Sequence, residues 1–145
     1  MSHTHASVLV HCVFSTKQRL NLIPDPEALW RYMAVVANDH NVTLLAAGGT
    51  KNLAHLLLRL RPVVPLAKII QELKASSSRW LREHGHRFTW QEGYGAFSIS
   101  QSQRQTVIDY IANQAEHHNK WTFEQEFMTL LEKSGAEYDP RFVFG

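Results

Sequence analysis

The segment Val42–Leu60, VTLLAAGGTKNLAHLLLRL, decides the fold expected for this chain. Its two halves, Val42–Ala47 and Ala54–Leu60, have strand-like composition, and the glycine pair between them predicts a tight turn. The two strands are therefore expected to form an antiparallel hairpin. Residues 55, 57 and 59 share one face of the second strand, and residues 56, 58 and 60 share the other. A histidine and an arginine on the first face, His55 and Arg59, indicate that this face is not simply core.

Strand and helix patterns alternate around this hairpin. The segments with such patterns are a strand over Ser7–Thr16, a helix from the cap Asp25-Pro26 to about His40, a long helix Leu66–His84, a strand Ala96–Ser100, a helix Gln103–His118 and a last helix Phe123–Ser134. This order predicts an α+β fold, a four-stranded antiparallel sheet of the ferredoxin-like kind with helices on one face, plus C-terminal helices. The sequence contains no visible linker or repeat, so residues 1–145 are assigned to one domain.

Composition and charge limit the function classes. The 145 residues have the apolar and charged fractions of a soluble globular protein. The single cysteine, Cys12, excludes an intramolecular disulfide framework. The sequence has no signal-peptide pattern and no apolar run of about eighteen residues, so a cytoplasmic protein that does not contact a membrane is expected. Residues 1–91 carry a net charge of +6 and residues 92–145 carry −4, which favours a polyanionic partner on one side.

The predicted helix Gln103–His118 carries a group of reactive side chains. Gln114 is the fourth residue after Tyr110, so a phenol and a carboxamide are expected about one turn apart, with His117 and His118 one turn further. This pattern could place a nucleophile beside a cation, although a plain surface helix gives the same spacing. A lone histidine in mid-strand, such as His11, is more typical of a packed or hydrogen-bonded residue than of a ligand.

Basic and hydroxyl side chains provide candidate phosphate contacts. They lie at the end of the first strand and on one face of the long helix, where they are Lys17, Arg19, Lys68, Lys74, Ser77, Arg79 and Arg82. Alternatively, these side chains are only exposed to solvent and contact no phosphate.

Four segments together resemble a known family. They are HCVFSTKQR at 11–19, ELKASSSRWLRE at 72–83, WQEGYGAFSIS at 90–100 and YIANQAEHHNKWTFEQE at 110–126. In this order and spacing they resemble the single-tyrosine HUH transposases of the insertion-sequence 200 type, most closely the REP-associated tyrosine transposase branch. The resemblance implies nicking and rejoining of single-stranded hairpin DNA through a 5′-phosphotyrosine at Tyr110. It also implies a homodimer and a Mg²⁺ or Mn²⁺ ion bound by two strand histidines and a glutamine, of which His55 and Gln114 match.

The sequence departs from this pattern at one metal ligand. Leu53 stands where the family has its first histidine, and leucine cannot bind a metal; His117 or His118 could replace it. Two interpretations stay open: an active transposase with an impaired metal site, and a domesticated, catalytically inactive protein that binds DNA hairpins. A third, less favoured by the sequence, is an RNA-binding module that stacks bases on Phe14 and Phe97.

Overall fold

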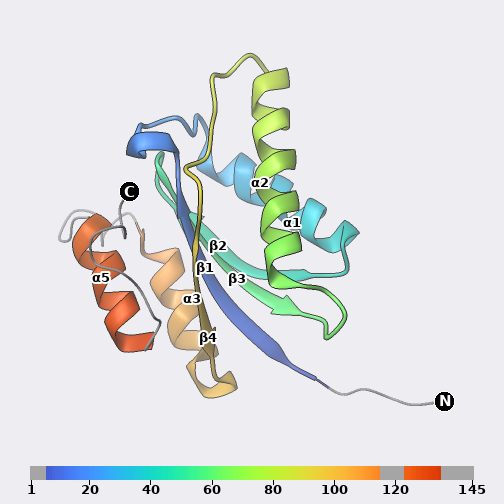
Figure 1. The fold of residues 1–145 in the computed structure, drawn as a ribbon, viewed down its shortest axis with the longest axis vertical. Coiled ribbons are helices and arrows are strands. Elements are labelled where there is room, and N and C mark those ends of the chain that lie inside the picture. The colour runs from blue at the N-terminus through green and yellow to red at the C-terminus, as the bar shows by residue number, and fades with distance from the viewer. Residues whose placement is uncertain (1–5, 115–122, 135–145) are drawn as a thin grey trace.

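The computed structural model describes residues 6–114 and 123–134. Four strands form one sheet, and four helices pack on it (Figure 1). The elements are β1 (Val8–Ser15), α1 (Pro26–Asp39), β2 (Thr43–Gly49), β3 (Leu53–Leu60), α2 (Leu66–Glu83), β4 (Gly95–Ile99), α3 (Arg104–Ala112) and α5 (Phe123–Ser134), with short 3₁₀ helices η1 (Lys17–Arg19) and η2 (Gln101–Gln103). In the described part of the chain, no helix has the length and apolar character needed to cross a membrane.

The sheet has the order β2-β3-β1-β4, and every neighbouring pair is antiparallel. This confirms the predicted α+β fold with a four-stranded antiparallel sheet. The predicted turn is in the wrong place, because Gly48 and Gly49 belong to β2 and pair with His55 and Ala54. The turn of the hairpin is formed by residues 50–52 instead. In this turn the Thr50 hydroxyl donates a hydrogen bond to the Asn52 side chain over 2.6 Å.

Helices α1 and α2 cover one face of the sheet (Figure 1). Alternate residues of β1 and β3 point into this layer and form the main core with both helices. Asp25 and Pro26 start α1 as the sequence predicts, since the Asp25 carboxylate accepts a hydrogen bond from the Ala28 amide over 3.3 Å. Gly85, at φ +87°, ends α2, where the His86 amide donates to the Leu81 carbonyl.

The C-terminal helices α3 and α5 cover the opposite face, so the sheet lies between two helical layers (Figure 1). Two small apolar clusters hold these helices. The first contains Leu9, Leu57 and Ile111 and packs against α3, and the second contains Val13, Leu53 and Phe97 and packs against α5. The sequence predicted both helices but not the face that they cover. The predicted helix Gln103–His118 is too long, because α3 ends at Ala112 with Asn113 as its cap, and residues 115–118 lie outside the described part of the chain.

Helix α3 approaches the sheet closely at Gly48. A β-carbon at this position would overlap the carbonyl oxygen of Ile111 and press on the Ile111 Cγ2 atom. Gly48 lies directly opposite His55 in the β2–β3 pairing. The absence of a side chain at Gly48 therefore lets the end of α3 rest on the strand beside His55.

We expect Gly48→Ala to destabilise the protein by about 1–3 kcal/mol, because the added methyl group must push α3 away from the sheet. Urea unfolding measures the loss, and amide chemical shifts of residues 107–112 report the movement of α3. Gly93→Ala is the matched control: its β-carbon would have no neighbour within 4 Å, so only the positive φ of +85° costs energy and the α3 shifts stay unchanged. Equal stability of Gly48→Ala and the parent protein would contradict the close contact.

We expect the Cys12 thiol to resist alkylation in the folded protein. Cys12 is completely buried, and this burial raises the pKa of its thiol to about 12. The thiolate is the reactive form, so at about pH 8 almost no reactive species is present. Iodoacetamide labelling followed by mass spectrometry should show an unmodified native protein and full modification in guanidinium chloride. Rapid labelling of the native protein would show that the site opens easily.

Candidate functional site

Two histidines from neighbouring strands meet on the face covered by α3 and α5. His55 lies on β3 opposite Val13, and His11 lies two residues before Val13 on β1. Their side chains are buried, with exposed fractions of 0% and 3%, and the His11 Nε2 and His55 Nδ1 atoms are 2.9 Å apart, a hydrogen-bond distance. The sequence analysis expected a packed or hydrogen-bonded His11 but did not identify His55 as its neighbour.

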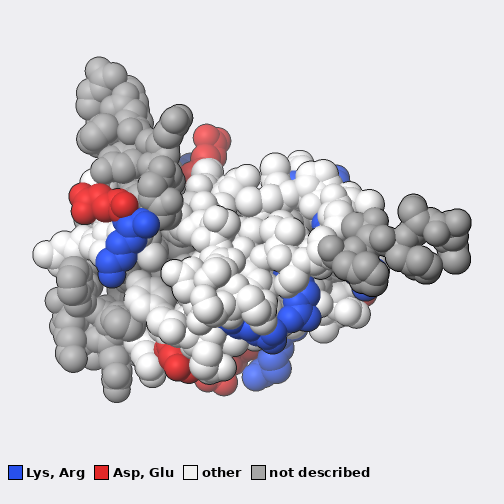
Figure 2. Space-filling model, turned by 90° about the horizontal axis from the view of Figure 1, so that it is seen from below, with Lys and Arg blue, Asp and Glu red and all other residues white. Residues whose placement is uncertain are grey.

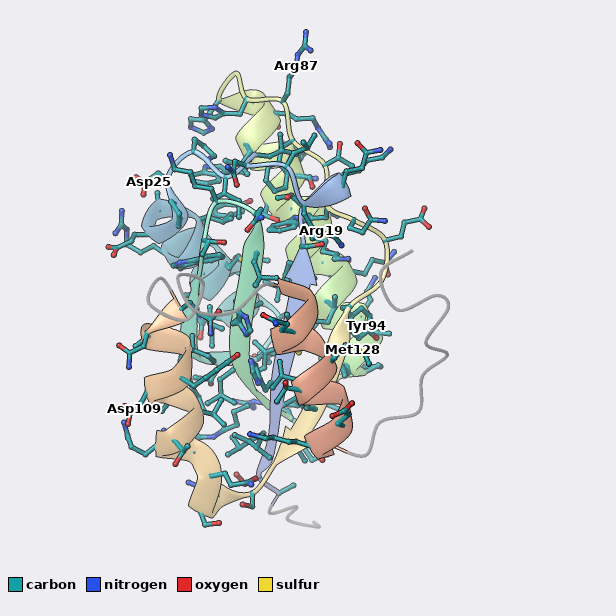
Figure 3. The ribbon with its side chains drawn as sticks, turned by 90° about the vertical axis from the view of Figure 1, so that its left-hand side faces the viewer. Arg19, Asp25, Arg87, Tyr94, Asp109 and Met128 are labelled. Atoms are coloured by element: carbon teal, nitrogen blue, oxygen red, sulfur yellow. The ribbon has the colours of Figure 1, made fainter. Side chains whose placement is uncertain are left out.

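Tyr110 lies over this histidine pair. Its ring centroid is 5.6 Å from that of His55 and 6.0 Å from that of His11, and both contacts are edge-on, with interplanar angles of 77° and 74°. Tyr110 is half-buried, whereas the neighbouring Asp109 is exposed on the outer edge of α3 (Figure 3). The structure thus brings Tyr110 and His55 together within one chain.

Gln114 follows α3 and is almost completely buried, with 1% exposure. Its Nε2 donates a hydrogen bond to the Tyr110 carbonyl over 3.3 Å. Its Oε1 is buried and has no hydrogen-bond partner among the described residues. A buried acceptor left without a donor is energetically costly, and a cation is one group that would satisfy it.

Leu53 fills the position where the resemblance places a first metal-binding histidine. Its side chain is buried with Val13 and Phe97, and Met128 and Leu130 of α5 pack on the same cluster. Position 53 is therefore part of the apolar contact that holds α5 on the sheet. The two other candidate ligands from the sequence, His117 and His118, lie outside the described residues.

The donor set suits a divalent cation even though it is small. Within residues 6–114 and 123–134, no three His, Cys, Asp or Glu side chains form a group that could hold a metal ion. His55 supplies an imidazole and Gln114 an amide oxygen, both of which are common ligands of Mn²⁺ and similar ions. The buried Gln114 oxygen is the feature that fits the cation implied by the resemblance.

Two of the predicted DNA contacts on the long helix α2, Lys74 and Ser77, have structural roles. The Lys74 ammonium donates to the carbonyls of Gln91 over 2.9 Å and Gly93 over 2.6 Å, and burial lowers the Lys74 pKa while Glu92 partly opposes this effect. Ser77 is fully buried. Its hydroxyl donates to the Leu73 carbonyl and accepts from the Trp90 Nε1 group over 2.9 Å. Ser77 thus belongs to the core, and its predicted contact with a phosphate is corrected.

The other predicted phosphate contacts are spread over the surface. Lys17 and Arg19 lie in η1, just past the end of β1 (Figure 3), while Lys68, Arg79 and Arg82 are exposed on α2. Helix α2 lies on the face of the sheet opposite to Tyr110. Lys68 forms a 3.1 Å ion pair with Glu72. On the face seen in Figure 2, basic side chains form small groups with acidic side chains nearby, and most of the surface is uncharged.

Solved structures of two other proteins share this fold. A transposase structure from Deinococcus radiodurans R1 is 22% identical, with a TM-score of 0.60 over 79% of this chain and 95% of that one. A REP-associated tyrosine transposase bound to a REP hairpin is 16% identical, with a TM-score of 0.62 over 100% of this chain and 97% of that one. None of the curated proteins matches the sequence.

A family model described as "Transposase IS200 like" matches residues 4–114. This match covers well over half of the chain and includes β1, the hairpin and the Tyr110 helix. The chain belongs to the IS200-like transposase family.

Proposed function

We propose that the protein binds single-stranded DNA that folds into hairpins, and that Tyr110 cleaves and rejoins this DNA. The observation that carries the proposal is the contact between the Tyr110 and His55 rings within a single chain, with Gln114 buried and bonded to the Tyr110 carbonyl. The family match supports a transposase, and the structural neighbour bound to a REP hairpin supports a hairpin substrate.

In the proposed reaction, the Tyr110 oxygen attacks a DNA phosphorus atom and forms a phosphotyrosine with the 5′ phosphate. The bond from phosphorus to the 3′ oxygen breaks, the phenol loses its proton, and the 3′ oxygen gains one to become a hydroxyl. A phenol, with a pKa of about 10, is a better leaving group than an alcohol. The reverse attack by a 3′ hydroxyl on the phosphotyrosine then rejoins DNA with no energy source other than the stored bond.

A divalent cation, Mg²⁺ or Mn²⁺, is part of the proposal. His55 and Gln114 would hold it beside Tyr110. When bound, such an ion polarises the scissile phosphate and stabilises negative charge on the departing oxygen. The chain itself positions the phenol, because Ile111 rests on Gly48 and the Gln114 amide group is bonded to the Tyr110 carbonyl.

Leu53 favours a second candidate function, a domesticated protein that binds DNA hairpins without cleaving them. The leucine removes one imidazole from the family's ligand set and gives position 53 an apolar packing role. The RNA-binding alternative receives no support, because Phe14 and Phe97 are buried on opposite faces of the sheet and neither offers a ring for base stacking. The homodimer and the cytoplasmic location stay predictions.

We expect the protein to form a covalent adduct with labelled hairpin DNA in the presence of Mn²⁺ or Mg²⁺, seen as a band that survives denaturing electrophoresis. Tyr110→Phe should abolish the adduct and leave hairpin affinity within about twofold, since it removes only the nucleophilic oxygen. Tyr94→Phe is the control, because Tyr94 is 43% exposed in the loop before β4 and lies outside the proposed site. An adduct that persists in Tyr110→Phe would exclude this nucleophile. Hairpin binding without any adduct would favour the non-cleaving candidate.

We expect hairpin affinity to fall steeply with salt, because Lys and Arg side chains that contact phosphates release counterions from the DNA. Lys17→Ala should reduce the slope of log K against log salt by about 0.7–0.9, the effect of one lost phosphate contact. Arg31→Ala removes an exposed charge from α1, outside the proposed set, and should leave the slope unchanged. Fluorescence anisotropy at several salt concentrations provides both slopes. Equal slopes for Lys17→Ala and the parent protein would remove Lys17 from the DNA-contacting surface.

A further inference from the structure

His11 and His55 form a buried pair on neighbouring strands. Two imidazoles from neighbouring strands direct ring nitrogens toward each other at 2.9 Å, with ring centroids 5.2 Å apart. Imidazole nitrogens that bind one cation at about 2.1 Å, with an angle of roughly 90° between them, are themselves about 3 Å apart. The observed separation therefore suits either a hydrogen bond or a shared cation after a small shift of the rings.

The surroundings of the two histidines favour a shared cation. Leu53 cannot be a ligand, and α5 packs on the apolar cluster to which it belongs. His11 is the described imidazole that lies beside His55, and Tyr110 lies over both. The Oε1 atom of Gln114, four residues after Tyr110 in the sequence, is buried with no hydrogen-bond partner among the described residues. A metal ion is one group that would satisfy this oxygen.

We propose that His11 of β1 supplies the second imidazole of a divalent-cation site, together with His55 and Gln114, in place of the histidine that the chain lacks at position 53. Two imidazoles and one amide oxygen favour Mn²⁺ or a later first-row ion over Mg²⁺, because Mg²⁺ prefers oxygen ligands. This inference adds a ligand to the cation site of the proposed function, and it rests on that function for the role of the site.

The test uses Mn²⁺ and the full chain without DNA. Electron spin-echo envelope modulation of bound Mn²⁺ detects the nitrogen nuclei of coordinating imidazoles. We expect couplings from two imidazoles in the parent protein and from one in His11→Ala. Isothermal titration should show a loss of Mn²⁺ affinity of at least about tenfold, which is the smallest effect usual for disturbing a metal ligand or its partner. His86→Ala, which removes an exposed histidine in the loop after α2, should change neither result.

A double-mutant cycle separates a ligand from a residue that only orients His55. If His11 is a ligand, Leu53→His should restore much of the affinity in the His11→Ala background and add little in the parent background. If His11 only orients His55 by a hydrogen bond, Leu53→His should give equal gains in both backgrounds, which would overturn the proposal. His11→Phe keeps a ring beside Phe97 and replaces His11→Ala if that variant fails to fold, as judged by circular dichroism without metal.

Two further outcomes would overturn the inference: no Mn²⁺ binding by the parent protein, or one imidazole coupling in both parent and His11→Ala. These outcomes differ from failure of the proposed function. Mn²⁺ bound through two imidazoles, in a protein that forms no DNA adduct, supports the cation site and argues against cleavage. An adduct that depends on Tyr110 but not on His11 supports the nucleophile and rejects His11 as a ligand.

Discussion

The close packing of α3 against β2 is the constraint on which the candidate site depends. Ile111 can rest on the sheet only because Gly48 has no side chain, and Gly48 is paired with His55. Tyr110 precedes Ile111 in α3, and Gln114 follows just after the helix ends at Ala112. A single backbone contact therefore sets the depth of the phenol and of the amide relative to the imidazoles. A larger residue at position 48 would move Tyr110 and Gln114 away from the sheet together, although it would contact neither side chain.

Most of the fold could be predicted from local sequence patterns, because each strand and helix has its own period and end signals. The boundaries of α5 match the predicted Phe123–Ser134, and α1 starts at the predicted Asp25 cap. Local sequence patterns did not predict features that depend on contacts between segments distant in the sequence. The glycine pair looked like a turn, yet the β2–β3 register extends through Gly49, and Gly48 serves the packing of α3. Ser77 looked like a surface hydroxyl, yet the Trp90 indole binds it in the core.

The candidate site was predicted in part for the same reason. Tyr110 and Gln114 are one turn apart, so helical spacing was enough to group them, and the resemblance added His55. The role of His11 required the register of β1 against β3, which places it diagonally to His55 across two strands. The signal available in the sequence was the alternation of β1, which puts His11 on the same face as Leu9 and Val13. Alternation alone does not identify the strand that lies alongside.

Leucine at position 53, where the resemblance implies a histidine, has a physical logic in this structure. Leu53 belongs to the apolar cluster against which Met128 and Leu130 of α5 pack, and an imidazole there would need a polar partner in an apolar contact. An imidazole on β1 lies beside His55 and under Tyr110 instead, so it leaves the α5 contact apolar.

Two imidazoles and an amide oxygen are all neutral donors, so a cation held by them keeps its full charge. Such a site binds an ion weakly by itself, and a phosphate oxygen would supply the missing negative charge. Cation and DNA affinity are then thermodynamically linked, and each must raise the other by the same factor.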